Sequence, residues 1–383
     1  MKFGWSKIAL AAMLLGLLAS PALAAEPAIA VAAPLTGPAA AYGDNVKAGV
    51  DMKVAEVNAK GGVNGMKLKV EYFDELCDPK EAATVAPKIV RDKNIVGIVG
   101  HVCSSAHLAA LPAYVRGGVL AISATATNVA ISSQNKDKEG KAWSFRDVYR
   151  DDFQGKFLAR YAKEALGLAK VAVFYENNDY GIGLKDAFVG EAKKIGLEVV
   201  GEEAYVKGAA DFTPQLTKLK AAGPQGIFLS GYYPEGALIA TQAKKVGLDV
   251  LKFGADGFDN ADYIKLAGEA AEGTYLSTPF IASEAGPEAQ AFVDAFKAKY
   301  NRDVDYMSAN AYDAAGILIE AVGKVGVDRA KVRDYLAGMN TPEKGYKGIT
   351  GLTYFDQHGD AQKPAFVKMV KGGAFATAPK QLK

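Results

Sequence analysis

Short apolar runs alternate with longer amphipathic stretches through the first third of the chain. The apolar runs cover residues 28–33, 68–73, 95–99 and 119–122, and the amphipathic stretches cover residues 45–58, 80–92 and 105–114. Strand-like runs that alternate with helix-like stretches predict βαβ units around a parallel sheet. This part of the chain therefore predicts one α/β lobe.

The same alternation restarts in the middle of the chain. Strand-like runs and helix-like stretches follow each other at residues 169–175, 183–195, 197–205, 213–222, 226–230 and 236–246. We find no residue-level repeat between the two series, so only the architecture is repeated. The sequence predicts a second α/β lobe, and we expect ordered strands to connect the lobes because no low-complexity linker separates them.

The last hundred residues predict helices followed by strands. Pro287 suits the first turn of a helix, and three helical stretches follow it and end near Gly338. A Gly-rich pair of strands is expected over residues 348–356 and 364–370. The predicted fold class is therefore α/β, with parallel sheets in two lobes.

The first 25 residues have the features of a secretory signal peptide. Lys2 and Lys7 precede an apolar run over residues 8–18, and small residues at 21–25 offer cleavage sites. The run is shorter than the ~20 apolar residues that a helix needs to span a bilayer, and no later segment has such a run without charges. No cysteine stands at the cleavage point for lipid attachment. We therefore expect a protein that is free in the periplasm, without membrane insertion.

The chain has two cysteines, Cys77 and Cys103. In an exported chain such a pair favours one disulfide, and a bridge that closes a loop of about 25 residues stabilises a fold by roughly 3 kcal/mol. The alternative is a pair of unpaired buried thiols. A thiol metal site is not indicated, because such sites use more ligands at closer spacing.

Length and composition exclude several function classes. Without its first 25 residues the chain is still longer than one core usually holds, which favours two domains. The 45 basic and 43 acidic residues are spread along the chain, so the sequence has no basic patch for nucleic acid. The three histidines lack the spacing of metal ligands, and no phosphate-binding Gly-x-x-x-x-Gly-Lys-Ser/Thr loop is present. We therefore expect no metal and no cofactor.

Two polar loops follow neighbouring strands of the first lobe. Ser104 and Ser105 lie where an apolar strand ends and a helix begins, and a helix N-terminus presents amide N–H groups that favour an anion. The loop from Ser123 to Thr127, which includes Thr125, follows the next strand. Ligands of open α/β sheets bind beyond the carboxyl ends of strands, so both loops are expected to face one crevice and to share one anion. Helix capping and an ordinary Ser/Thr turn are the alternatives.

Three strand ends of the second lobe carry aromatic or acidic residues, namely Tyr180, Tyr232 and Asp256. Aromatic faces can enclose an apolar side chain while a carboxylate pairs with an ammonium group. Together with the loops of the first lobe, this set suits a zwitterion. Taken singly, each of the three is also typical of a turn or a surface position.

Two enzyme interpretations are weaker than a binding function. Residues 181–186 follow a strand and open a helix, but Asp186 stands where a dinucleotide fingerprint needs glycine or alanine, and it opposes a pyrophosphate. A serine hydrolase would combine Ser104 or Ser105 with a histidine and an aspartate, yet no Gly-x-Ser-x-Gly elbow surrounds either serine. We expect no enzyme, and a purely structural role is the other alternative.

A series of motifs runs in order along nearly the whole mature chain. Its members are Pro34-Leu35-Thr36-Gly37 with Tyr42-Gly43-Asp44, Asn58-Ala59-Lys60-Gly61-Gly62, Asp74 with Cys77-Asp78-Pro79-Lys80, Gly100-His101 with Cys103-Ser104-Ser105, Tyr180-Gly181, Gly231-Tyr232-Tyr233-Pro234-Glu235, and Phe355-Asp356 through Gly359-Asp360. Each motif alone is weak. The ordered series resembles the type I periplasmic binding proteins of branched-chain amino acid transporters, the leucine/isoleucine/valine-binding group.

The resemblance implies two Rossmann-like lobes that are joined by three crossovers and hold the ligand in the cleft between them. It implies that residues 26–145 and 280–361 form the first lobe, and that residues 146–279 and 362–383 form the second. It also implies a bridge between Cys77 and Cys103. The implied partners are a small amino acid and the inner-membrane permease of an ABC transporter, and we expect a monomer.

The resemblance also implies roles for single residues. Ser104 and Thr127 would bind the ligand α-carboxylate, assisted by backbone groups near Thr125. Asp256 and Tyr180 would receive the ammonium group.

The side-chain pocket is expected to be formed by mainly aromatic residues. Those implied are Tyr42, Cys103, Tyr232 and either Tyr306 or, in another alignment, Tyr312.

One position departs from the family pattern. Branched-chain binders commonly have glutamate where this chain has Asp256, and aspartate is shorter by one methylene. The ammonium must then shift, or a water must intervene. The ligand can therefore be a branched-chain or another small neutral amino acid, proline or γ-aminobutyrate, with an amide, a urea-like compound or an aromatic acid as the alternative.

Overall fold

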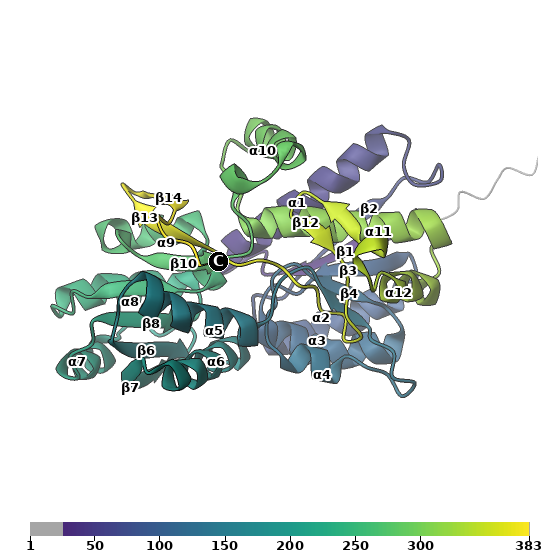
Figure 1. Cartoon of the computed structure of the whole chain (residues 1–383). Helices are drawn as coiled ribbons and strands as arrows, with labels where there is room; N and C mark the ends of the chain where they lie inside the picture. The colour runs from purple at the N-terminus through teal and green to yellow at the C-terminus, as the bar shows by residue number, and fades with distance from the viewer. Residues whose placement is uncertain (1–25, 383) are drawn as a thin grey trace, which may run out of the picture.

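The computed structural model describes residues 26–382 of the chain. The predicted signal peptide lies outside these residues. Within the described range, no helix is long and apolar enough to cross a membrane. Figure 1 shows two lobes side by side, each built around its own sheet.

The first lobe contains a five-stranded sheet in the order β2-β1-β3-β4-β5, and all its strands are parallel. The strands are β1 (Ala28–Ala33), β2 (Lys69–Asp74), β3 (Ile95–Gly100), β4 (Ala121–Ser123) and β5 (Ser144–Arg146). Every residue of β1 and β3 is buried. This burial explains why these segments are continuous apolar runs, because a parallel sheet is covered by helices on both faces.

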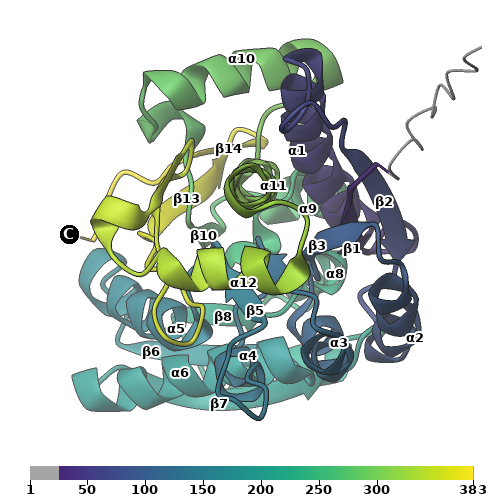
Figure 2. The same ribbon diagram turned by 90° about the vertical axis from the view of Figure 1, so that its right-hand side faces the viewer.

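Helices cover both faces of this first sheet. They are α1 (Ala40–Ala59), α2 (Pro79–Arg91), α3 (Ser104–Gly117), the short α4 (Ala130–Gln134), and, from the last third of the chain, α11 (Tyr306–Val325) and α12 (Arg329–Gly338), while α10 (Pro287–Tyr300) packs on α1 and α11. Figure 2 shows α1 and α11 on one side of the sheet and α2 and α3 on the other. The predicted three helices between residues 287 and 338 are confirmed, and they belong to the first lobe.

The second lobe contains a seven-stranded sheet in the order β14-β13-β10-β9-β8-β6-β7. Its strands are β6 (Lys170–Glu176), β7 (Glu198–Tyr205), β8 (Gly226–Ser230), β9 (Leu251–Gly254), β10 (Tyr275–Thr278), β13 (Phe366–Lys371) and β14 (Ala374–Thr377). The strands β6 to β10 are parallel, whereas β13 is antiparallel to both β10 and β14.

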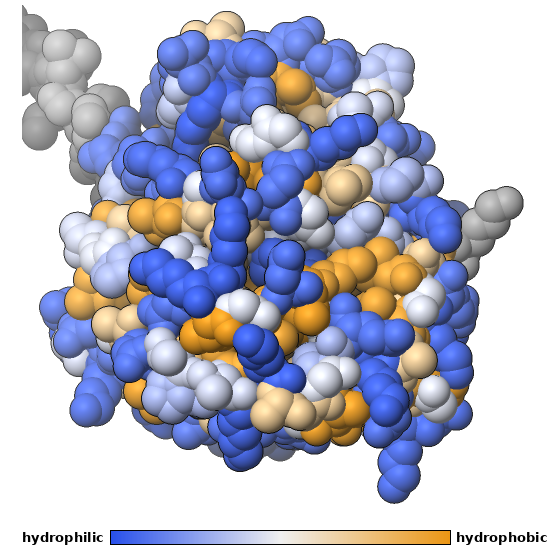
Figure 3. Space-filling model, turned by 90° about the vertical axis from the view of Figure 1, so that its left-hand side faces the viewer, coloured by the Kyte–Doolittle hydropathy of each residue, from blue (hydrophilic) through white to orange (hydrophobic). Residues whose placement is uncertain are grey.

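Two groups of helices enclose the second sheet. The helices are α5 (Asp151–Arg160), which continues as a π-helical turn to Ala165, α6 (Asp179–Ile195), α7 (Thr213–Ala221), α8 (Tyr233–Lys245) and α9 (Ala261–Ala267). Along β6, Val171 and Val173 pack toward α5 and α6, and Ala172 and Phe174 pack on the opposite side. Figure 3 views this lobe from outside and shows a mainly hydrophilic face crossed by a band of hydrophobic residues.

The two strands expected near the C-terminus do not pair with each other, so that prediction is wrong. The segment expected at residues 348–356 forms the hairpin of β11 (Tyr346–Gly348) and β12 (Gly351–Thr353), while the segment expected at 364–370 joins the other lobe as β13. Lys368 of β13 explains part of this preference, since its buried ammonium lies 2.8 Å from the carboxylate of Asp259. The pattern of apolar and polar residues along one strand does not show which strand it pairs with when that strand is about a hundred residues away in the sequence.

Three segments carry the chain between the sheets, after β5, after β10 and before β13. Two of them are joined by buried ion pairs, Arg146 with Asp360 at 2.6 Å and Lys363 with Asp147 at 2.7 Å. Buried charges of this kind need their partners, so the pairs fix the crossovers side by side. We propose that the lobes divide at these crossovers, near residues 146, 280 and 361.

The two cysteines form a disulfide. The Cα atoms of Cys77 and Cys103 lie 5.4 Å apart, within the range of a bridge, and their sulfur atoms are bonded. The bridge that the family resemblance implied is therefore present, and the alternative of two free thiols is excluded for this structure. It connects the loop after β2 to the start of α3.

Candidate functional site

The polar loops of the first lobe lie together, as the parallel sheet order requires. The loop after β3 and the loop after β4 are joined by hydrogen bonds from Thr125 Oγ1 to the carbonyl of Val102, at 2.9 Å, and from the amide of Asn128 to Ser104 Oγ, at 3.2 Å. Ser104 is the first residue of α3, so its hydroxyl and the amides of that first turn point out of the helix N-terminus. The hydroxyl of Thr127 is buried and has no hydrogen-bond partner among residues 26–382. This arrangement offers hydroxyl and amide groups to an anion.

Asp256 is the centre of a hydrogen-bonded cluster at the opposite side of the crevice. Its carboxylate accepts hydrogen bonds from Tyr180 Oη at 2.6 Å, from Gln154 Nε2 at 2.9 Å and from Tyr306 Oη at 3.1 Å. Tyr180 lies in the first turn of α6 and Tyr306 is the first residue of α11. Both lobes therefore contribute donors to one carboxylate.

The carboxyl group of Asp256 is buried, and its burial raises its pKa above the ordinary value. The hydrogen bonds from Tyr180, Gln154 and Tyr306 lower the pKa, but less than burial raises it. A cation placed beside this group would favour the ionised form and would replace part of the lost hydration. The site is therefore suited to an ammonium group.

Tyrosine rings form the wall between the two polar ends. The rings of Tyr180 and Tyr232 are stacked with centroids 5.0 Å apart, and Tyr42 meets Tyr232 edge-on at 5.9 Å. Tyr42 belongs to α1 of the first lobe, and its hydroxyl donates to the carbonyl of Gly257 and accepts from the amide of Tyr233, both in the second lobe. The lobes are thus in direct contact around the site, which is the closed arrangement.

A narrow cavity lies between these groups. Its lining residues are Tyr42, Val102, Ser104, Thr125, Tyr180, Tyr232, Asp256, Gly257, Tyr306 and Met307. Seven of the nine predicted ligand-binding residues are in this set. Between the two alignments, it is Tyr306 that lies at the cavity, while Tyr312 packs against Phe292 of α10 and bonds Glu56.

The other two predicted residues, Cys103 and Thr127, do not line this cavity. The sulfur of Cys103 is bonded to Cys77, which directs its side chain toward the disulfide loop, and the neighbouring Val102 takes the place at the wall. The carbonyl of Thr127 accepts from the amide of Asp151 at 3.0 Å, and the hydroxyl of Thr127 is buried without a hydrogen-bond partner among residues 26–382.

Asp151 is a candidate site residue that the sequence does not reveal. It is fully buried at the start of α5, and neither of its carboxylate oxygens has a hydrogen-bond partner within the described part of the chain. Burial raises its pKa well above the ordinary value, and the neighbouring charge of Asp256 raises it further. The amide of Asp151 donates to the carbonyl of Thr127 at 3.0 Å, so the group lies beside the loop after β4, although it does not line the cavity. In the sequence it looks like an ordinary acidic residue in the first turn of a helix.

Gln154 is a second residue that the sequence does not reveal. One turn after Asp151 on α5, its Nε2 lies 2.9 Å from Asp256, 3.0 Å from Tyr149 and 2.9 Å from Ser277, and its two hydrogens can serve two of these three acceptors at a time. The amide therefore orients the carboxylate from the second lobe. No motif distinguishes this glutamine from a surface residue, because the signal is its burial.

The serines and histidines of the first lobe make other contacts than those of a hydrolase. His101 Nε2 lies 2.7 Å from Tyr114 Oη, and His107 Nε2 lies 2.8 Å from Ser144 Oγ. The hydroxyl of Ser104 accepts a backbone hydrogen bond, as described above, and that of Ser105 accepts one from the amide of Asp179. In residues 26–382, neither serine hydroxyl is hydrogen-bonded to a histidine.

Comparison with known proteins places this geometry in context. The family model described as periplasmic binding protein matches residues 26–374. The leucine-, isoleucine-, valine-, threonine- and alanine-binding protein of Pseudomonas aeruginosa is 36% identical over 352 residues, which are 91% of each chain. The crystal structure of a leucine-binding protein from Thermotoga maritima superposes with a TM-score of 0.85 at 30% identity, covering 92% of this chain and 97% of that one. The substrate-binding protein of a branched-chain amino acid transporter from Streptococcus pneumoniae, solved with isoleucine, has the same TM-score and identity and covers 93% and 99%.

Proposed function

Because the chain belongs to the family of periplasmic binding proteins, we propose that it captures a small neutral amino acid between its lobes and delivers it to the permease of an ABC transporter. Relatives that cover nine tenths of the chain are named for binding leucine, isoleucine and valine, and one of them also for threonine and alanine. The proposed location of the mature protein is the periplasm, in keeping with the predicted signal peptide.

The observation that carries the proposal is the opposition of two kinds of polar group across one cavity. Ser104 and the amides at the start of α3 lie at one end, and the buried Asp256 lies at the other. An α-carboxylate fits the first end and an α-ammonium fits the second, because each supplies the charge that its surroundings favour. A ligand with only one of these groups would leave the other end desolvated and unpaired.

Asp151 strengthens the cationic end in this proposal. Asp151 is a second buried carboxyl group without a hydrogen-bond partner among residues 26–382, and its burial away from water is unfavourable when it is charged. An ammonium group near both aspartates would make the charged form more favourable. The two acids together also offset the shorter reach of aspartate, relative to glutamate, at position 256. We propose that the ammonium lies beside Asp256 and that Asp151, which does not line the cavity, adds to the negative potential there.

The tyrosine wall sets the kind of side chain that the site accepts. Four tyrosines and Met307 line the cavity, so mainly apolar ring faces would surround the ligand side chain and favour an aliphatic one. The space between them is about 10 Å³, so these side chains must move apart when a ligand enters. Buried tyrosines combine apolar faces with hydroxyls that bond the acid cluster. The proposed ligands are therefore alanine, valine, leucine and isoleucine, and γ-aminobutyrate and proline share the required charges.

Capture proceeds by closure of the lobes. We propose that the amino acid first binds the hydroxyls and helix N-terminus of the first lobe, and that Tyr180, Tyr232 and Asp256 then close over it. Closure excludes water and strengthens each polar contact in the site. No step in this process makes or breaks a covalent bond, so we propose a binding protein and not an enzyme.

A thermal-shift screen of the mature protein tests the proposal. The screen uses the twenty amino acids, γ-aminobutyrate, short amides and aromatic acids, because a ligand of the native state raises its melting temperature. We expect a rise with a group of neutral amino acids. A response to amides or aromatic acids alone would keep the transport role and reject the zwitterion site, and silence from every compound would contradict the proposed function.

A further inference from the structure

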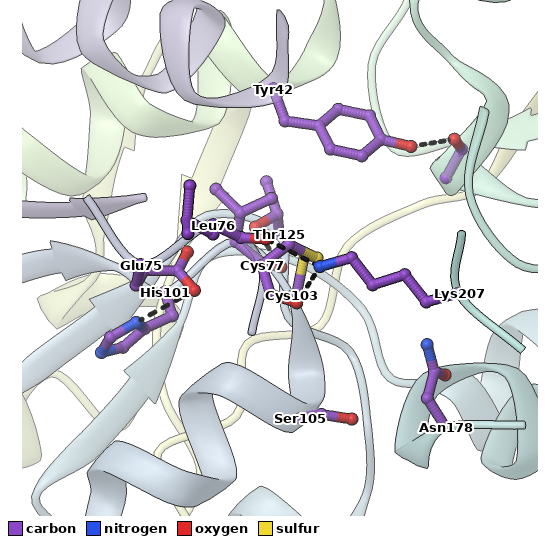
Figure 4. Close-up of a disulfide and its surroundings, with 12 residues drawn as sticks. Tyr42, Glu75, Leu76, Cys77, His101, Cys103, Ser105, Thr125, Asn178 and Lys207 are labelled. Carbon is purple, nitrogen blue, oxygen red and sulfur yellow. Dashed lines mark hydrogen bonds and ion pairs between the residues drawn. A yellow bond between two sulfur atoms is a disulfide. The ribbon is translucent and has the colours of Figure 1, made fainter. Parts of the chain in front are cut away.

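A lysine of the second lobe reaches across to the disulfide loop of the first. Lys207, which follows β7, donates from its Nζ to the carbonyl oxygens of Leu76, at 2.7 Å, and Cys77, at 2.9 Å. Figure 4 shows its side chain extended over the loop beside the bridge to Cys103. Neither Lys207 nor its two acceptors lines the ligand cavity. The contact therefore joins the lobes outside the site.

The two acceptor carbonyls are held in an unusual backbone conformation. Leu76 has a φ of 55° and Cys77 a φ of 53°, both in the left-handed region that L-amino acids seldom adopt. The amide of Leu76 donates to the carboxylate of Asp74 at 3.2 Å, and Cys77 is covalently bound to Cys103. These two constraints hold the turn so that both carbonyls meet one ammonium group.

The same bridge leads directly to the ligand site. Cys103 immediately precedes Ser104, the residue that lines the cavity at the start of α3. The next residue, Ser105, accepts the amide of Asp179 in the second lobe at 3.1 Å. The disulfide therefore ties the loop that Lys207 contacts to the element that presents the anion-binding groups.

We propose that Lys207 and the disulfide loop form a latch that stabilises the closed state and sets the affinity for every ligand without touching any of them. This inference deepens the proposed function and rests on it. The contact forms only when the lobes are together, so its free energy is added to the closed state alone. Apparent affinity increases with the population of the binding-competent state, and a longer-lived closed complex releases its ligand more slowly.

A latch has a different signature from a residue of the binding site. Loss of a group that contacts the ligand changes the order of preference among ligands, because ligands use that group to different extents. Loss of the latch lowers all affinities by one common factor, since the missing contact is the same in every complex. Lys207 is in this sense a positioning residue.

The test compares Lys207→Met with Lys220→Met. Lys220 is also an exposed lysine, and it donates to the backbone carbonyl of Val246 at 2.9 Å. Because Lys220 and Val246 belong to the same lobe, this contact does not join the lobes. Affinities for L-leucine, L-valine and L-alanine are measured by calorimetry, and dissociation rates by stopped flow. We expect Lys207→Met to weaken the binding of each amino acid by the same factor, roughly three- to tenfold for the loss of two hydrogen bonds that are open to solvent, mainly through faster dissociation.

Two further variants test the parts of the latch. Lys207→Arg keeps a charged donor and is expected to retain most of the affinity. In the double variant Cys77→Ser with Cys103→Ser, the carbonyls are no longer held, so the addition of Lys207→Met is expected to cost less than it does in the bridged protein. If this bridge-free protein fails to fold, the Lys207 series decides the question by itself.

The outcomes separate the latch from the proposed function. Lys207→Met affinities equal to those of wild type, or losses that differ among the three amino acids, overturn the latch while the binding function stands. If the wild-type protein binds none of the three amino acids, the proposed function fails on these probes. Whether Lys207 stabilises the closed state is then decided by the radius of gyration of the unliganded proteins, measured by X-ray scattering. A larger radius for Lys207→Met than for wild type and Lys220→Met supports the latch, and equal radii overturn it.

Discussion

At the scale of single residues, the site depends on buried carboxylates that lack a counter-ion of their own. Tyr180, Gln154 and Tyr306 supply neutral donors to Asp256, and none of them neutralises its charge. A permanent cation in their place would compete with the ligand. This arrangement is what the proposed ammonium site requires.

Replacement of Asp256 by asparagine tests the cationic end. We expect Asp256→Asn to weaken amino-acid binding by ~2 to 5 kcal/mol, because the buried ammonium loses its charged partner. The unliganded protein should melt at or above the wild-type temperature, since burial already disfavours the charge. Calorimetric titration measures the affinity, and Asp249→Asn, at an exposed position, is the control. A loss of less than about tenfold, which is 1.4 kcal/mol, would remove Asp256 from this role.

The anionic end has its own test in a double variant. Ser104→Ala with Thr127→Ala removes two hydroxyls that lie near the start of α3, and we expect it to abolish carboxylate binding while the unliganded protein keeps its melting temperature. Ser133→Ala, whose hydroxyl bonds a carbonyl of its own short helix, is the control. Unchanged affinity in the double variant would return both residues to helix capping and turn formation.

Glu176, at the end of β6, is expected to make the stability of the protein depend on pH. It is buried, and burial raises its pKa to about 8 from the ordinary 4.5, with the charge of Glu235 adding to the effect. Between these two values the unfolded chain has released its proton while the native state holds it. This contribution to stability is therefore complete below pH 4.5 and is lost as the pH rises through about 8.

Removal of the titrating group should abolish that loss. We expect Glu176→Gln to melt close to wild type at pH 5 and to be more stable than wild type by at least about 1 kcal/mol at pH 9. Denaturant unfolding at both values measures the difference. Glu139→Gln, at an exposed position, should leave the pH profile unchanged. Parallel profiles of wild type and Glu176→Gln would show that Glu176 ionises normally.

At the scale of elements, the sequence predicted the alternation of strands and helices, and it failed where helices begin at the site. The strands 28–33 and 226–230 have the predicted bounds, because a buried parallel strand is a plain apolar run. Three helices begin three to five residues before their predicted starts, namely α1 at Ala40, α6 at Asp179 and α8 at Tyr233.

These first turns carry Tyr42, Tyr180 and Tyr233, all of them buried. Tyr42 and Tyr233 bond backbone groups of the other lobe, whereas Tyr180 packs in its own lobe and bonds Asp256 at the cavity. Amphipathic periodicity reports burial against one core, so residues that are buried between lobes break the pattern. The same cause hid Asp151 and Gln154. The ordered motifs include Ser104 and Tyr180 because such motifs depend on residue identity and not on periodicity, whereas the prediction of Asp256 rests on its place at a strand end and on the family pattern.

The helices α1 and α11 cross closely and bring Tyr42 and Tyr306 to one cavity. Their close approach requires a glycine at position 49. A Cβ at Gly49 would lie 2.2 Å from the carbonyl oxygen of Ser308, so the two backbones are in direct contact there. We expect Gly49→Ala to destabilise the protein by about 1 to 3 kcal/mol, as overpacking does, and to weaken binding by displacing the tyrosines.

Thermal unfolding and titration measure both effects. Gly190→Ala is the matched control, because Gly190 lies in α6 with open space around it, and alanine there should be neutral or stabilising. A Gly49→Ala protein with wild-type stability would show that the helices can separate without cost.

At the scale of the molecule, the fold divides the candidate site between two lobes that contact each other around the cavity. The first lobe contributes the anion-binding loops and Tyr42, and the second contributes Tyr180, Tyr232 and Asp256. Neither half binds a zwitterion alone, because each holds groups for mainly one of its charges. Under the proposed function, capture is coupled to closure, and the closed form is what a permease would recognise.

The most direct test of this account is a calorimetric titration of the mature protein with the amino acid that the screen identifies and with two analogues of it. One analogue lacks the ammonium group and the other lacks the carboxylate. The account predicts one bound amino acid per chain and no measurable binding of either analogue, since each leaves one buried end of the cavity unpaired. Binding of the deaminated analogue as tightly as the amino acid would contradict the account, because Asp151 and Asp256 would then have no part in recognition.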